Sequence, residues 1–299
     1  MRQVFFAALL FFAAPSFCQD CTTSVVVNVF DDNLHIDVQT LKADDFQARM
    51  DKNALTIVNT EQKYDSRLLV LVETDGSADD AKLQDEIDTI TRMARQAPEG
   101  KPIAFGVYAS RAVFTRGFIA DPEKRNTEIG EVIEQGNSLG KRVALFDALH
   151  EALQFFGKYQ PGDTILLVGG PYDDKSSHSI ADVKKEFLAT GTRLMAMLRR
   201  PMSFVARDDF MFSTHEPEKS LFLDFSEKTG GAHSQFDPRF FSFAWRGYML
   251  EVKVPVQESK PRKWSLRLRG GVKAAFKHSR IFYPELLPPC HVATVSGTH

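Results

Sequence analysis

The chain has 299 residues, of which 43% are hydrophobic and 25% are charged, and its formal net charge is −2. This composition is ordinary for a folded globular protein, and the length fits one large domain or one domain with additions. The charge excludes the basic field that nucleic-acid binding requires, so nucleic acid is not an expected partner.

The first 18 residues have the order of a cleavable secretory signal peptide. Arg2 precedes an apolar run over residues 4–14, and the small residues Ser16 and Cys18 follow it. The run is shorter than the roughly 20 apolar residues that span a bilayer. We expect cleavage after Cys18 and a periplasmic or secreted mature chain without a transmembrane segment. A buried core helix or a lipid-anchored Cys18 are the alternatives.

Two cysteines remain after this cleavage. Cys21 and Cys290 lie near opposite ends of the mature chain. In an oxidising compartment, such a pair indicates a disulfide, and two free thiols are the alternative.

At both ends of the mature chain, apolar and polar residues alternate with the period of two that is typical of antiparallel strands. At the N-terminal end, Asp- and Asn-rich turns separate the short apolar runs. We expect the two ends to pair in one small sheet. The predicted strands cover residues 25–30, 34–38, 46–50 and 55–58, and then 250–254 and 264–268.

Between these ends, continuous apolar runs alternate with helical spacings, which predicts a mostly parallel sheet with helices on both faces. The expected strands are 68–72, 103–107, 165–168 and 194–198, with an edge strand within 111–119, and the expected helices are 83–94, 146–156, 180–187 and a segment ending at Gly230 and Gly231. The fold class is therefore α/β, doubly wound and Rossmann-like. The expected division is a signal peptide 1–18, an N-terminal β segment 19–62, an α/β domain 63–246 and a C-terminal β segment 247–299.

Most enzyme signatures are absent from the sequence. His150 and Glu151 lack a second histidine at the zincin spacing, because position 154 is Gln. There is no phosphate-cradling glycine loop and no Gly-x-Ser-x-Gly elbow. One loop does carry candidate chemistry, because Glu73, Asp75 and Ser77 follow the first core strand, where open α/β sheets bind ligands. A turn followed by a helix cap is the structural alternative for these residues.

The order of these segments resembles a von Willebrand factor A domain. The ends of the chain resemble bacterial VWFA-related exported proteins, a family first described from Acidobacteria. The resemblance implies a protein-binding module and not an enzyme. It is carried by the acidic loop, by residues 144–149 (ALFDAL), 164–170 (TILLVGG) and 228–231 (KTGG), and by the end segments 41–46 and 248–250.

The resemblance also implies a metal-ion-dependent adhesion site, in which oxygens from three loops hold a divalent cation. Glu73 stands at the first Asp of that motif, Asp75 at its first Ser, and only Ser77 matches. Val143 stands near the expected Thr, and Gly169 stands at the late Asp. We therefore expect a degenerate site without a metal cofactor. A rearranged site of Glu73, Asp75 and Ser77 that still takes Mg²⁺ or Ca²⁺ is the alternative.

Charged residues in neighbouring loops are candidates for further contacts with the acidic loop. Asp173 or Asp174 would be the further oxygen ligands of such a site. Lys141 and Arg142 are the candidates for a positive group between the carboxylates of the acidic loop, where they would relieve the repulsion without a cation.

Aromatic residues are dense after Phe204, and most are expected in the core. A minority is expected to form a partner surface, since aromatic side chains are favoured in interfaces. The expected partner is an unknown protein or envelope macromolecule. The alternatives are a hydrolase that uses Glu73 and Asp75 as acid and base, and a structural component of the cell envelope. The candidate surface residues are Phe210, Phe212, Phe240, Phe241 and Trp245.

Overall fold

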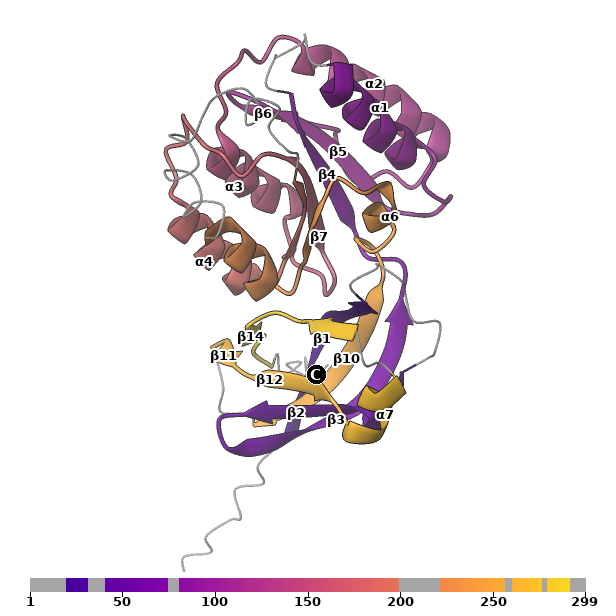
Figure 1. The fold of residues 1–299 in the computed structure, drawn as a ribbon, viewed down its shortest axis with the longest axis vertical. Coiled ribbons are helices and arrows are strands. Elements are labelled where there is room, and N and C mark those ends of the chain that lie inside the picture. Colours follow the sequence, from indigo (N-terminus) through magenta and orange to yellow (C-terminus); the bar gives the residue numbers. More distant parts are fainter. Residues whose placement is uncertain are drawn as a thin grey trace, which may run out of the picture.

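The computed structural model of the chain describes residues 20–31, 41–74, 81–198, 221–255, 260–275 and 279–290. Within these ranges the strands form two six-stranded sheets and one two-stranded sheet (Figure 1). The expected signal peptide and the expected strand over 34–38 lie outside the described residues. None of the described helices is both long and apolar enough to cross a membrane.

The first large sheet is mostly parallel. Its strands follow the order β6-β5-β4-β7-β8-β9, and only β6 is antiparallel to its neighbour. Numbered within this sheet, the order is 3-2-1-4-5-6, which is the order of doubly wound α/β folds. The fold class expected from the sequence is confirmed. The strands are β4 (Leu68–Glu73), β5 (Ile103–Tyr108), β6 (Ala112–Phe114), β7 (Thr164–Gly169), β8 (Arg193–Leu198) and β9 (His233–Gln235).

Helices cover both faces of this sheet, as Figure 1 shows. Alternate strand residues therefore face two separate cores, so that Val70 and Phe105 lie in one and Leu71 and Leu167 in the other. A strand buried on both faces has no polar face, which explains the continuous apolar runs of the sequence. One face packs against α1 (Ala81–Arg95), α2 (Pro122–Gly136) and α6 (Pro238–Phe241), and the other against α3 (Leu145–Phe156), α4 (Ile180–Thr190) and the helical residues 221–228.

The second large sheet is antiparallel and combines both ends of the chain. Its order is β12-β2-β3-β10-β1-β13, with β1 between two strands from the C-terminal segment. The expected pairing of the chain ends is therefore confirmed. Its strands are β1 (Asp20–Asp31), β2 (Phe46–Met50), β3 (Asn53–Lys63), β10 (Gly247–Pro255), β12 (Ser265–Leu268) and β13 (Ser279–Phe282). The same parts of the chain also form the short helices η1 (Ala43–Asp45) and α7 (Gly270–Ala275) and the two-stranded sheet of β11 (Arg262–Lys263) and β14 (Leu286–Leu287).

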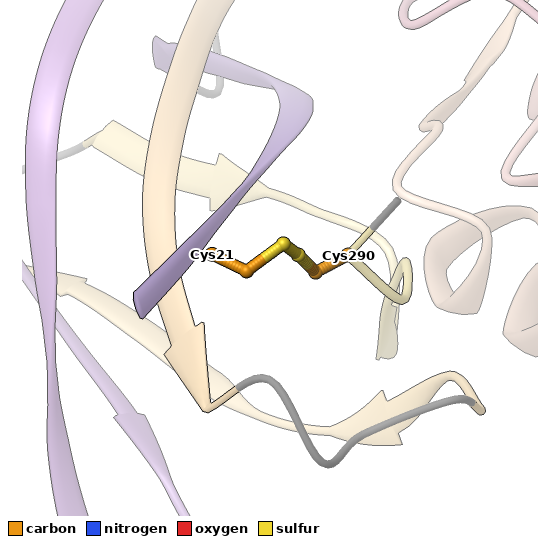
Figure 2. Close-up of a disulfide and its surroundings, with 2 residues drawn as sticks. All are labelled: Cys21 and Cys290. Carbon is orange, nitrogen blue, oxygen red and sulfur yellow. A yellow bond between two sulfur atoms is a disulfide. The ribbon is translucent and has the colours of Figure 1, made fainter. Parts of the chain in front are cut away.

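The expected disulfide joins the two ends of this antiparallel layer. Cys21 at the start of β1 is bonded to Cys290, which follows β14 (Figure 2). Their α-carbons are 5.8 Å apart, a separation that an unstrained disulfide spans.

A buried arginine links the two layers. Arg193 opens β8 and is 1% exposed. Its guanidinium donates to the Thr164 hydroxyl at 2.8 and 3.1 Å and to the side-chain oxygen of Asn28 on β1. The amide of Asn28 in turn donates to the carbonyl of Arg246 at 2.8 Å. Burial lowers the pKa of Arg193 to about 10, so the group stays charged at neutral pH and its acceptors hold the layers together.

Candidate functional site

The candidate site lies at the carboxyl-end edge of the parallel sheet. The strand order reverses around β4, whose neighbours β5 and β7 lead the chain away in opposite directions. Such a switch point is the usual ligand-binding position of doubly wound folds. Glu73 ends β4, Tyr108 ends β5 and Gly169 ends β7. Asp75 and Ser77 of the acidic loop lie outside the described residues.

Glu73 reaches across this edge to the loop after β7. Its side chain is buried, and its Oε2 accepts the backbone N–H of Gly170 at 2.5 Å. The hydrogen bond stabilises the charged form of a carboxylate that burial would otherwise penalise. Glu73 therefore ties the end of β4 to the loop that follows β7.

Neighbouring side chains fill the space that a side chain at Gly169 would need. A Cβ at this position would lie 2.5 Å from Oε2 of Glu73 and 2.7 Å from the hydroxyl oxygen of Tyr108. An aspartate would therefore displace both side chains. The two departures from the adhesion motif, Glu at its first position and Gly at its late position, thus compensate for each other in space. Sequence reasoning treated them as two unrelated losses.

Val143 belongs to the loop before α3, and its backbone is paired with Asp174. The N–H of Val143 donates to Oδ1 of Asp174 at 2.8 Å, and the N–H of Asp174 donates back to the carbonyl of Val143 at 3.0 Å. The Val143 side chain packs partly buried against the α3 core. Arg142 donates to the backbone carbonyl of Asp174 at 2.9 Å. The placement of Lys141 or Arg142 beside Asp75 stays a prediction.

Asp173 caps the first turn of α3. Its carboxylate accepts the N–H of Phe146 at 3.3 Å and that of Ser176 at 3.2 Å. Negative charge is stabilised at a helix N-terminus, because the backbone N–H groups there lack helical partners. Asp173 and Asp174 therefore pair with residues at the start of α3 and, through Ser176, within their own loop. Their role as further ligands beside Glu73 stays a prediction.

Within the described ranges, no group of three or more His, Cys, Asp or Glu side chains is arranged to hold a metal ion. Because Asp75 and Ser77 fall outside those ranges, the metal-free state of the acidic loop stays a prediction.

The expected aromatic partner surface is wrong for two of its residues. Phe240 and Phe241 on α6 are at most 1% exposed and belong to the core between α1, α2 and the sheet. Trp245 is half-buried and packs edge-on against Phe241, with ring centroids 4.9 Å apart. The short helix turns both phenylalanines inward, which their spacing alone did not reveal. Phe210 and Phe212 lie outside the described residues.

A cluster that sequence reasoning missed lies beside this edge, between α3 and the start of α4. His178 Nδ1 is 2.7 Å from Oδ1 of Asp147, and His150 Nδ1 is 2.7 Å from Oε2 of Glu186. The two imidazole rings are stacked, with centroids 4.2 Å apart. These histidines are 28 positions apart in the sequence and have no motif in common, so only the fold brings them together.

Comparisons with known proteins give structural likeness alone. No protein-family model and no curated protein matches the chain. A von Willebrand factor type A protein from Catenulispora acidiphila is 10% identical, with a TM-score of 0.46 over 92% of this chain and 74% of its own. BatB from Bacteroides thetaiotaomicron is 11% identical, with a TM-score of 0.45 over 60% of this chain and 96% of its own.

A third solved structure is proximal thread matrix protein 1 from the mussel byssus, with a zinc-occupied MIDAS motif. It is 13% identical, with a TM-score of 0.47 over 64% of this chain and 50% of its own. TM-scores below 0.5 do not establish a common fold. The fold assignment therefore rests on the strand order and the helix layers, and membership of the Acidobacteria-type family stays a prediction.

Proposed function

We propose that this chain is an exported, non-enzymatic module of von Willebrand A type that binds another macromolecule through the carboxyl-end edge of its α/β sheet, without a bridging metal ion. Export is supported by the Cys21–Cys290 disulfide, because disulfides persist in oxidising compartments. The partner is an unknown protein or another macromolecule of the cell envelope.

The observation that carries the metal-free part is the contact between Glu73 and the β7 loop. An adhesion-type site needs an oxygen ligand after β7, where Gly169 has none. The space for that ligand holds the Glu73 carboxylate, which accepts a hydrogen bond from Gly170. An N–H donor thus contacts the carboxylate where a cation would otherwise bind, and the edge keeps its shape without one.

Metal independence is tested by thermal unfolding in EDTA and in millimolar Mg²⁺ or Ca²⁺. The curves should coincide. A cation that binds only the native state at 100 times its dissociation constant adds about 2.7 kcal/mol of stability. An upward shift of several degrees in Mg²⁺ that disappears in Glu73→Ala would show that the acidic loop holds a cation and would overturn this part of the proposal.

The binding edge is tested by crosslinking and pull-down from the native envelope, read by mass spectrometry. Lys141 and Lys175 are exposed in loops at this edge, whereas Lys52 and Lys158 are exposed elsewhere. The double charge reversal Lys141→Glu with Lys175→Glu should lose the captured partner. The matched reversal of Lys52 and Lys158 should retain it. Equal capture by both double variants would place the binding surface elsewhere.

A further inference from the structure

The histidine cluster joins a surface loop to the first turn of α3. His178 lies in the loop before α4, and its ring nitrogen contacts Asp147 of α3. The same carboxylate accepts the backbone N–H groups of Ser177 and His178, each at 3.0 Å. In the opposite direction, the N–H of Asp147 donates to the hydroxyl of Ser176 at 2.9 Å. Asp147 therefore holds residues 176–178 on the helix, and His178 supplies the one titratable donor.

The second histidine extends the contact to α4. The His150 ring from α3 stacks on His178 with an interplanar angle of 16°, and its Nδ1 contacts Glu186 of α4. Both rings are about one-third exposed, so protons exchange freely with solvent. In the described part of the chain, the charged groups around the pair include the carboxylates Asp147 and Glu151 from α3 and Asp182 and Glu186 from α4, with Arg111 near Glu151.

We propose that the stacked pair of His150 and His178 is a pH-sensitive fastening, which holds the loop of residues 170–179 against α3 when His178 is protonated and loosens it as the pH rises. A protonated His178 ring makes a charge-assisted hydrogen bond to Asp147 and keeps its stacking contact with the His150 ring. Loss of the proton leaves only a neutral hydrogen bond between the ring and Asp147, so the backbone hydrogen bonds of Ser177 and His178 to Asp147 open more often.

The direction of the pH dependence follows from the surrounding charges. The hydrogen bond to Asp147 raises the pKa of His178, with further contributions from Asp147, Glu186 and Asp182. Burial raises the pKa of Asp147, but the hydrogen bonds from Ser177 and His178 outweigh it and lower the pKa to about 2. The pKa of His178 is higher in the folded state than in the unfolded state. Its contribution to the stability of the folded state is therefore complete at pH values below the ordinary pKa range of histidine. That contribution is lost as the pH rises through the folded-state pKa.

The same loop shapes the sheet edge described above. Gly170 donates to Glu73, Asp173 caps α3 and Asp174 pairs with Val143, all within residues 170–179. Loosening at His178 therefore changes the surface at the carboxyl ends of the strands. The fastening itself is a property of the free protein, so its test needs no partner and does not depend on the proposed binding function.

The test is amide hydrogen exchange of the intact protein between about pH 5.5 and pH 8.5, with rates corrected for the intrinsic effect of pH. The protection of the Ser177 and His178 amides should fall roughly fivefold across this range, because a charge-assisted hydrogen bond is about twice as strong as a neutral one. In His178→Gln, which keeps a donor without a titration, the protection should not change with pH. The matched control His233→Gln should show the same fall as the wild type.

A second measurement keeps the proposal falsifiable if a variant folds poorly. Imidazole resonances of the wild-type protein should show His178 titrating above the ordinary histidine midpoint, and Asp147→Asn should return it toward that midpoint. Constant protection of Ser177 and His178 across the pH range in the wild type would overturn the proposal. So would an undiminished fall in His178→Gln.

Discussion

At the scale of single residues, Glu73 and Gly169 depend on each other. Gly169→Ala should lower the free energy of unfolding by roughly 1–3 kcal/mol, because the new Cβ would lie 2.5 Å from Oε2 of Glu73. Glu73→Ala removes that atom, so the double variant should be less destabilised than the sum of the two single variants. Urea unfolding measures this coupling. Gly117→Ala is the control, since nothing lies within 4 Å of its Cβ position. Strict additivity would contradict the compensation.

Lys101 is a residue whose burial costs stability. It is 6% exposed, and its ammonium lies 5.4 Å from the Trp245 ring centroid with no hydrogen-bond partner in the described part of the chain. Burial lowers the pKa of Lys101 to about 8. Lys101→Met should therefore stabilise the protein by roughly 1–2 kcal/mol at neutral pH, which is the desolvation cost less the lost cation–π contact.

The pH dependence of this gain has a definite sign. Between about pH 8 and pH 10.5, the unfolded chain keeps a proton on Lys101 that the native protein has released, so wild-type stability rises with pH. The advantage of Lys101→Met should be greatest below pH 8 and should shrink above it. Chemical denaturation at several pH values measures the difference. Lys158→Met, at an exposed position, is the control and should show no such trend. A Lys101→Met variant less stable than the wild type at pH 7 would show that the ammonium contributes more than its burial costs.

At the scale of elements, α2 shows where sequence patterns fail. Its buried face includes the charged residues Arg125 and Glu128, which hide the helical period. Arg125 donates to the backbone carbonyls of Arg95, Ala97 and Lys101, and Glu128 accepts the N–H of Arg116. These partners come from other segments, so the sequence could not reveal where the buried charged groups would find hydrogen bonds. Arg125 Nε and Glu128 Oε1 have no hydrogen-bond partner within the described residues. In contrast, the buried residues of α3 and α4 are all apolar, and these two helices were predictable.

One local signal could have located α2. Asp121 precedes Pro122, and its carboxylate accepts the N–H of Lys124 at 2.7 Å. An Asp cap followed by Pro at the first helical position is a helix start. Asp121→Ala should lower the free energy of unfolding by about 1 kcal/mol, whereas Asp121→Ser should keep most of the stability that the cap contributes. Urea titration distinguishes the two. Equal loss in both would mean that the charge, and not the cap, matters.

The candidate site was predictable only in outline. The position of Glu73 at a strand end followed from the apolar run before it, and the edge followed from the alternation of strands and helices. The contact of Glu73 with Gly170 and the capping role of Asp173 required the loops to be placed in space. Loop conformation depends on individual hydrogen bonds and not on a repeating pattern, so spacing alone could not supply it.

At the scale of the whole molecule, the ends of the chain build one layer together, which explains the position of the disulfide. Cys21 and Cys290 are 269 positions apart, yet β1 lies between β10 and β13 and brings them into contact. The strand pairs hold this layer even without the covalent bond. The disulfide therefore stabilises mainly by restricting the unfolded chain, and its long loop makes that effect large.

Removal of this bond should leave the native fold in place but make it easier to unfold. The double variant Cys21→Ser with Cys290→Ser should lose roughly 3–5 kcal/mol of unfolding free energy and keep its circular dichroism spectrum. Each single variant should match the double variant, and a reductant should destabilise only the wild type. Thiol titration of the denatured, unreduced wild type should find neither Cys21 nor Cys290 reactive. If both thiols titrate, or if the double variant unfolds at the wild-type urea concentration, the covalent link between the chain ends contributes nothing.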